Sequence, residues 1–115
     1  MRNYGVDEEY ITGSKSEKEK FIAYCKTLGK AFGNPLYHWS QVELKEFFNC
    51  ELEINEKNAL KIWDECNAFI QKNNVTPQKL IEQSNVKYLF TTNEIFDDLE
   101  VFKELKEKNY HFEVR

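Results

Sequence analysis

The sequence is poor in the residues from which enzymes build metal sites and phosphate-binding loops. It contains two histidines and four glycines in 115 residues. No histidines or cysteines have the spacing of a metal site, although a mixed site of His, Cys and carboxylates stays open. No glycine pattern matches a dinucleotide-binding or phosphate-binding loop, and no motif supports serine–histidine–aspartate catalysis. Motifs alone therefore predict a helical domain without chemistry of its own.

Long hydrophobic runs are also absent, and the cysteines are few. No segment has the length and apolarity of a membrane span, and the first residues have no signal-peptide character. The three cysteines, Cys25, Cys50 and Cys66, are odd in number and form no Cys-x-x-Cys pair. We therefore expect reduced thiols and a cytoplasmic location, with Cys66 as a small buried hydrophobe. The excess of 20 acidic over 16 basic residues argues against a nucleic-acid surface.

What the sequence does have is helical periodicity with start signals. Ser16 and Glu19 form a capping box, which predicts a helix from Ser16. Ser40 and Glu43 repeat the pattern, which predicts that a second helix begins at Ser40, after the turn made by residues 33–35.

Two more helices are predicted further along the chain. Asn55 is the expected N-cap of the third helix, whose apolar residues recur at the helical period until residues 73–74. Thr76 followed by Pro77 predicts the start of a short fourth helix.

The pattern changes after residue 84. Residues 86–92 are β-branched and aromatic and predict a buried parallel strand, and residues 111–114 predict a second strand. Between them we expect a turn at residues 93–98 and a helix with Leu99, Phe102 and Leu105 on one face. Parallel strands need such a crossover, and two strands cannot bury both faces of a sheet, so neighbouring strands are expected elsewhere.

Several segments, in this order, resemble the bacterial uronate isomerases. The most recognisable is Gly-Asn-Pro-Leu-Tyr-His-Trp at residues 33–39, and the others lie at residues 5–13, 43–45, 55–59, 62–63, 80–87, 91–92 and 97–100. The resemblance implies a piece of an amidohydrolase-like (β/α)₈ barrel enzyme. The expected fold class is mainly α: residues 1–84 form a helical insertion domain of four to five helices, and residues 85–115 form a strand–helix–strand segment of an incomplete barrel.

The resemblance also implies an activity and its missing parts. Uronate isomerases interconvert D-glucuronate with D-fructuronate, and D-galacturonate with D-tagaturonate. The family is much longer than this chain. Its metal-binding His-x-His pattern and its proton-transferring residues have no counterpart here, and Met1 and Arg2 resemble an internal pair of the family. We expect the chain alone to be inactive and to hold no metal, with hexuronate substrate, and a divalent metal if there is one, bound only by the full-length enzyme.

Two clusters are candidates for contact with the substrate. Tyr37, His38 and Trp39 could form a wall over a sugar site, or they could be a hydrophobic staple or aromatic plug beside the Ser40 cap. Thr91 and Thr92 lie at the carboxyl end of the first predicted strand, where a barrel has its catalytic face, but threonine also suits a strand end and a helix cap.

A pair of carboxylates is a weaker candidate. Asp97 and Asp98 are adjacent, and we interpret them as the first turn of the last helix, where the helix dipole favours acidic residues.

Two other interpretations stay open at this point. The chain could be a stand-alone helical protein-interaction module without catalysis, or, less in keeping with its acidic charge, a helix-turn-helix nucleic-acid binder. If the strands are those of an incomplete barrel, their unpaired edges predict self-association. We expect no binding to membranes or nucleic acid.

Overall fold

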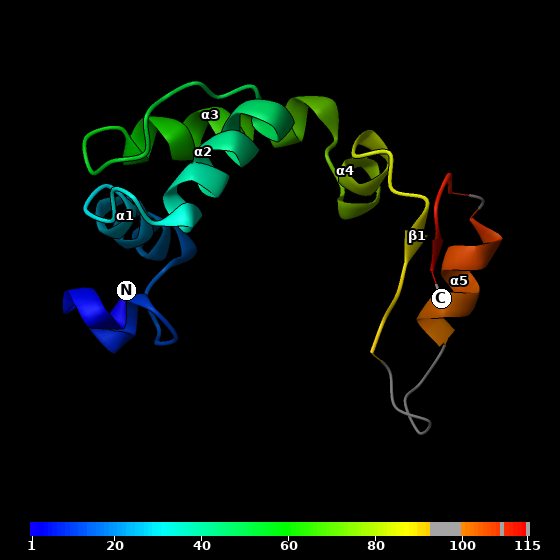
Figure 1. Ribbon diagram of the computed structural model, residues 1–115, viewed down its shortest axis with the longest axis horizontal. Helices are drawn as coiled ribbons and strands as arrows, with labels where there is room; N and C mark the ends of the chain where they lie inside the picture. Colours follow the sequence, from blue (N-terminus) through cyan, green and yellow to red (C-terminus); the bar gives the residue numbers. More distant parts are fainter. Residues whose placement is uncertain (93–99, 109, 115) are drawn as a thin grey trace. The chain divides into compact units, whose positions relative to one another are not determined.

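The structure, a computed structural model, describes residues 1–92, 100–108 and 110–114. It is mainly helical and divides into two compact units, residues 1–74 and 75–115 (Figure 1). The first unit contains the 3₁₀ turns η1 (Arg2–Tyr4) and η2 (Glu8–Tyr10) and the helices α1 (Glu17–Leu28), α2 (Pro35–Phe48) and α3 (Ala59–Asn73). The second contains α4 (Pro77–Gln83), β1 (Tyr88–Leu89), α5 (Glu100–Glu107) and β2 (Glu113–Val114). The domain boundary expected after residue 84 stays a prediction. The two compact units divide after residue 74, so α4 lies in the same unit as the strands.

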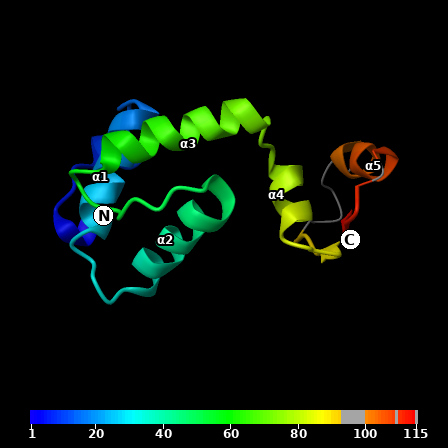
Figure 2. The same cartoon turned by 90° about the horizontal axis from the view of Figure 1, so that it is seen from above.

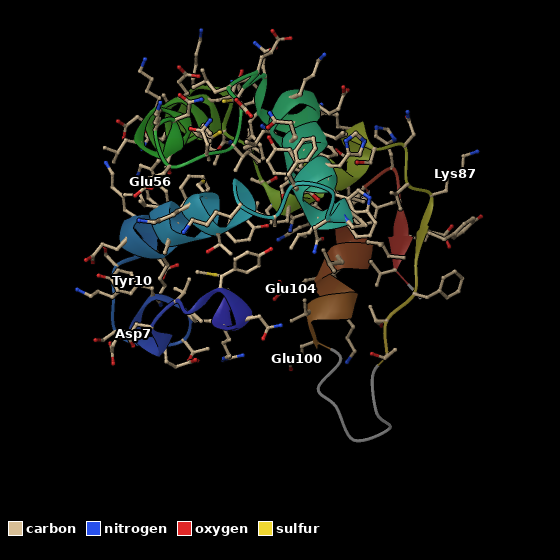
Figure 3. The ribbon with its side chains drawn as sticks, turned by 60° about the vertical axis from the view of Figure 1, so that its left-hand side comes forward. Asp7, Tyr10, Glu56, Lys87, Glu100 and Glu104 are labelled. Carbon is tan, nitrogen blue, oxygen red and sulfur yellow. The ribbon has the colours of Figure 1, made fainter. Side chains whose placement is uncertain are left out.

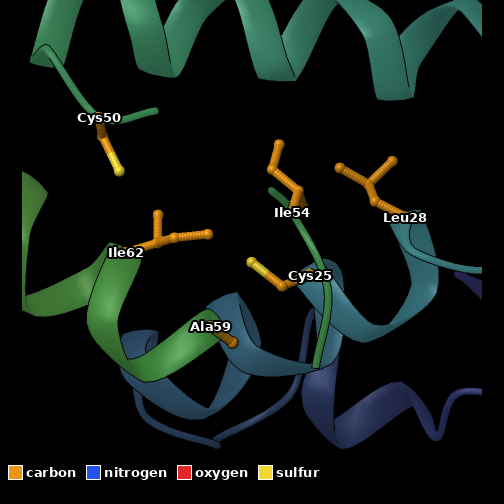
Figure 4. Packing of buried hydrophobic residues seen from close by; sticks show 6 residues of the cluster. All are labelled: Cys25, Leu28, Cys50, Ile54, Ala59 and Ile62. Atoms are coloured by element: carbon orange, nitrogen blue, oxygen red, sulfur yellow. The ribbon is translucent and has the colours of Figure 1, made fainter. Parts of the chain in front are cut away.

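The core of the first unit lies where three helices meet. Both α1 and α2 pack against α3 (Figure 2). Six buried residues from α1, α3 and the α2–α3 loop form the cluster shown in Figure 4: Cys25, Leu28, Cys50, Ile54, Ala59 and Ile62. Burial of this apolar surface is the main force that holds the three helices together.

The start of α1 confirms the predicted capping box. The Ser16 hydroxyl accepts a hydrogen bond from the Glu19 backbone N–H, and the Glu19 carboxylate accepts one from the Ser16 backbone N–H at 3.1 Å. Each side chain thus satisfies an N–H group that the helix itself leaves free.

The predicted start of α2 at Ser40 is wrong. The helix begins at Pro35, and the Asn34 side chain accepts from the Leu36 backbone N–H at 2.9 Å. Proline is favoured at the first helical position because its fixed φ suits the helix and its missing N–H is not needed there. Ser40 lies within the helix instead, buried, with its hydroxyl 3.0 Å from the Tyr24 hydroxyl.

The corrected start of α2 gives a prediction about Asn34. We expect Asn34→Ala to lower the free energy of unfolding by about 1 kcal/mol, because the Leu36 N–H loses its acceptor. Asn34→Gly is the matched control and should cost only a few tenths of a kcal/mol, since glycine is tolerated as an N-cap. Urea unfolding followed by circular dichroism measures both, and equal losses would contradict the cap.

The start of α3 is also later than predicted. Asn55 does not cap the helix; its side chain accepts from the Asn58 backbone N–H at 3.0 Å, and the helix begins at Ala59. Asn55 therefore closes a turn, an arrangement that asparagine favours as much as an N-cap. The Thr76 cap of α4, with Pro77 at the first helical position, is confirmed.

The second unit contains the predicted parallel pair. Tyr88 is paired with Glu113 and Leu89 with Val114, and α5 lies in the connection between the strands. Parallel sheets usually have both faces covered, but Tyr88 is 50% exposed and Phe90, just after β1, is 77% exposed. The expectation of a buried strand is therefore wrong for this chain, because within the described residues β1 pairs with β2 alone.

Some expectations lie outside the described residues. These are the turn at 93–98, with Asp97 and Asp98 in it, and Leu99. The Phe102 side chain also lies outside the described part of the structure. Leu105, the remaining residue of the expected apolar face, is half-buried on α5.

Candidate functional site

The three predicted aromatic-cluster residues lie in the first two turns of α2, and the helix separates them. Tyr37 is half-buried against the core, and its hydroxyl donates to the Glu53 carboxylate at 3.3 Å. Burial and this neighbouring carboxylate raise the pKa of the Tyr37 phenol. His38 is exposed, and Trp39 is 61% exposed. Of the three, the structure therefore ties Tyr37 into the unit and leaves the other two facing outward.

A polar cavity of about 400 Å³ lies beside Tyr37. It is lined by Tyr37, Gln41, Lys45, Glu51 and Glu53. Neither His38 nor Trp39 lines it. The interpretation of the cluster as a staple or plug beside a Ser40 cap is wrong, because Ser40 is not a cap and Trp39 is exposed.

The predicted pair of threonines lies after the carboxyl end of β1. Thr91 and Thr92 are both exposed. Because β2 runs parallel to β1, the carboxyl ends of the two strands lie at the same edge of the sheet. This is the edge at which ligands bind in parallel α/β folds.

A further cavity of the first unit was not predicted from the sequence. It has a volume of about 540 Å³ and lies between the N-terminal turns and α1. Its lining combines aromatic, apolar and charged side chains: Tyr4, Val6, Asp7, Tyr10, Glu19, Ile22, Ala23, Lys26, Thr27, Lys30 and Glu56, together with Gly5. Figure 3 labels Asp7 and Tyr10, from the N-terminal turns, and Glu56, from the α2–α3 loop. The sequence did contain one sign of this region, because Asp7 precedes two glutamates. In the structure Asp7 is the N-cap of η2, and its side chain accepts a hydrogen bond from the Glu9 backbone N–H.

An ion pair holds the two N-terminal turns together. Arg2 donates twice to the Glu8 carboxylate, at 2.6 and 2.8 Å, and the Thr12 hydroxyl donates to it at 2.7 Å. These hydrogen bonds lower the pKa of Glu8 to about 2, and the largest effect comes from Arg2. Hydrogen bonds to a carboxylate favour its charged form.

This carboxylate gives a prediction about pH. The folded-state pKa of Glu8 is lowered, so its contribution to stability is present above the ordinary glutamate pKa of 4.5 and is lost as the pH falls from there towards 2. A carboxyl ¹³C NMR titration should give Glu8 a midpoint near 2, and Arg2→Ala should move it towards 4.5. A Glu8 midpoint that Arg2→Ala leaves in place would contradict the ion pair.

The thiols and histidines form no metal centre in the part of the chain that the structure describes. No group of three or more His, Cys, Asp or Glu side chains is placed there to hold a metal ion. The three cysteines are unpaired. Burial raises the pKa of Cys25 to about 11, and burial together with the neighbouring Cys50 raises the pKa of Cys66 to about 12. Both thiols therefore stay protonated at neutral pH and serve in packing.

The family follows from comparison with known proteins. A family model described as glucuronate isomerase matches residues 1–115. The chain belongs to this family. The resemblance seen in the sequence is thus confirmed, and it covers both units.

Individual relatives agree with the family. The uronate isomerase of Clostridium perfringens is 50% identical over 107 residues, which are 93% of this chain and 23% of that protein. The uronate isomerase of Halalkalibacterium halodurans is 44% identical over 115 residues, 99% of this chain and 24% of that protein. A crystal structure of uronate isomerase from Thermotoga maritima matches with a TM-score of 0.88 and 38% identity, over 98% of this chain and 25% of the other.

Each of these matches covers only part of the relative. The chain spans about a quarter of the length of the isomerases that it matches. No helix within the described residues is long and apolar enough to cross a membrane.

Proposed function

We propose that this chain forms one part of a uronate isomerase that interconverts D-glucuronate with D-fructuronate, and D-galacturonate with D-tagaturonate. The observation that carries the proposal is the superposition with the Thermotoga maritima uronate isomerase, at a TM-score of 0.88 over 98% of the chain. At 38% identity, this agreement supports the same structural role in the same kind of enzyme.

The chain is expected to be inactive without further polypeptide. An aldose–ketose isomerisation needs groups that move a proton between adjacent carbons, held within hydrogen-bond reach of the substrate. The two histidines lie in different units, and the described residues contain no metal-binding cluster, so they do not fit a divalent metal by themselves. Any metal that the enzyme uses would be held by residues outside this part of the chain.

A chimaeric enzyme tests the proposed activity. The matching 107 residues of the Clostridium perfringens isomerase are replaced by this chain, and the conversion of D-glucuronate is followed by ¹H NMR. We expect conversion by the chimaera and none by the isolated chain. A second chimaera, with a Gly/Ser linker of equal length, is the control. A folded chimaera that converts neither D-glucuronate nor D-galacturonate would overturn the proposal.

The finer architecture belongs to the same proposal. We place β1 and β2 as neighbouring strands of a (β/α)₈ barrel, because such barrels are built from parallel strands joined by helices. The parallel pairing, the intervening α5 and the exposed Tyr88 and Phe90 support this placement, since further strands and helices would cover those rings.

In that barrel, Thr91 and Thr92 would lie nearest the substrate. Active sites of (β/α)₈ barrels form at the carboxyl ends of the strands, and both threonines follow the carboxyl end of β1 and are exposed. In the active chimaera we expect Thr91→Val combined with Thr92→Val to lower kcat/KM about tenfold, which corresponds to the loss of one hydrogen bond of about 1.4 kcal/mol. Thr91→Ser combined with Thr92→Ser, which keeps both hydroxyls, is the matched control and should retain kcat/KM. An unchanged kcat/KM would remove both threonines from the site.

The aromatic cluster has a lesser place in this proposal. Tyr37 is held by Glu53 and the core, so we assign it to structure. His38 and Trp39 face outward and remain available to contact groups outside the unit. His38→Ala in the chimaera tests contact with the substrate, and an unchanged kcat/KM would exclude it.

A further inference from the structure

Helix α2 carries apolar side chains on two sides. One side, which includes Tyr37 and Leu44, packs on the core of the first unit. Residues three apart on the other side are Leu36, Trp39 and Val42, which are 45%, 61% and 45% exposed. We call Leu36, Trp39 and Val42 the α2 outer face.

This arrangement is unusual for a helix at a protein surface. Surface helices normally carry one apolar stripe and a polar opposite face, and helices that are apolar all round are buried. The later part of α2 follows that rule, because Glu43, Lys45 and Glu46 are exposed there. A contiguous apolar patch beside such polar residues is typical of a contact surface.

The size of the patch decides between two occupants. One aromatic and two aliphatic side chains at these exposures present on the order of 300 Å². A stable interface between two separate proteins usually needs about 800 Å² from each partner. The α2 outer face is therefore too small to hold a second copy of the chain by itself, whereas contacts within one polypeptide need no such minimum.

The comparisons favour a contact within one longer polypeptide. The Thermotoga maritima isomerase contains this fold as 25% of its length, so three quarters of that chain lies outside the matched part. We infer that the α2 outer face docks against uronate isomerase polypeptide outside these 115 residues. The inference rests on the proposed function, and it assigns a contact surface that the isomerase activity itself does not require.

Thiol labelling tests this contact. In a background with Cys25, Cys50 and Cys66 replaced by alanine or serine, Trp39→Cys supplies a single thiol in the isolated chain. The same substitution is made in the chimaera, whose host cysteines are also replaced. We expect labelling by a maleimide at least tenfold slower in the chimaera than in the chain. Leu60→Cys, at an exposed apolar residue of α3, is the control and should react at similar rates in both.

The outcomes separate this inference from the proposed function. Equal labelling of Trp39→Cys in a folded chimaera would overturn the inference, whether or not the chimaera is active. Protection in the isolated chain that increases with its concentration would assign the face to a second copy and would also overturn it. An inactive but folded chimaera that still protects Trp39→Cys would support the docking and contradict only the proposed activity.

A second measurement does not depend on cysteine removal. Leu36→Glu combined with Trp39→Glu should leave the unfolding midpoint of the isolated chain nearly unchanged, because these side chains are exposed there. In the chimaera, the same pair should lower the midpoint by several degrees, since the charges would be buried. Leu60→Glu is the control for a single exposed apolar residue. Equal shifts in the chain and the chimaera would contradict the docking.

Discussion

Ile62→Ala is expected to lower the free energy of unfolding of the first unit by about 3 kcal/mol. Ile62 is fully buried in α3, at the centre of the cluster that joins the helices. Its removal costs the transfer free energy of the lost carbons and leaves a cavity that the helices fill only in part. A small domain is stable by about 5–15 kcal/mol, so this one change removes a large share of the total.

The matched control is Leu60→Ala, two residues away on the same helix. Leu60 is 51% exposed, so its truncation should cost about 0.5 kcal/mol or less. Urea unfolding of the full chain, followed by far-UV circular dichroism, measures both variants. A loss at Ile62 no larger than the loss at Leu60 would show that the described packing of α3 is wrong.

The starts of the helices show which boundaries local sequence patterns can predict. The Ser16 and Thr76 caps could be predicted because each has one helix to begin, although Ser14 and Glu17 repeat the capping-box spacing beside Ser16. Before α2, two signals lie six residues apart, Asn34–Pro35 and Ser40–Glu43, and both satisfy the chemistry of an N-cap. Tertiary structure decides between them, because the Ser40 hydroxyl lies buried beside Tyr24.

That one shift changes the interpretation of the aromatic cluster. In a loop before Ser40, Tyr37, His38 and Trp39 could all point to one site. In a helix, successive residues turn by about 100°, so the three side chains point in different directions. The grouping of these three residues therefore depended on a helix boundary that local patterns leave ambiguous.

The N-terminal cavity could not be predicted for a different reason. Its lining comes from segments far apart in the sequence, and Lys26 of α1 meets Glu56 of the α2–α3 loop at 2.7 Å. No periodicity brings such residues together. The parallel pairing of β1 with β2 could be predicted because connection length and chain direction are linked for parallel strands.

Gln41→Leu is expected to destabilise the first unit by about 2–4 kcal/mol, since two backbone groups lose their partners. The Gln41 side chain donates to the Leu52 carbonyl oxygen at 2.9 Å and accepts from the Ile54 backbone N–H at 3.0 Å. It thereby fixes the α2–α3 loop at the point where Ile54 enters the core. Leucine has a similar size but can form neither hydrogen bond, and the two partly buried backbone groups would lack their present partners.

Gln41→Glu distinguishes the two hydrogen bonds. At pH 7 a carboxylate still accepts from the Ile54 N–H but cannot donate to the Leu52 carbonyl, so we expect an intermediate loss. Below the ordinary glutamate pKa of 4.5, the protonated carboxyl regains a donor, and the difference from the unsubstituted chain should shrink. Gln71→Leu, at an exposed glutamine of α3, is the control and should change stability by about 0.5 kcal/mol or less. If Gln41→Leu proves as mild as Gln71→Leu, then this amide does not hold the loop, and the Tyr37 cavity, which Gln41 and Glu53 line, has a different shape in solution.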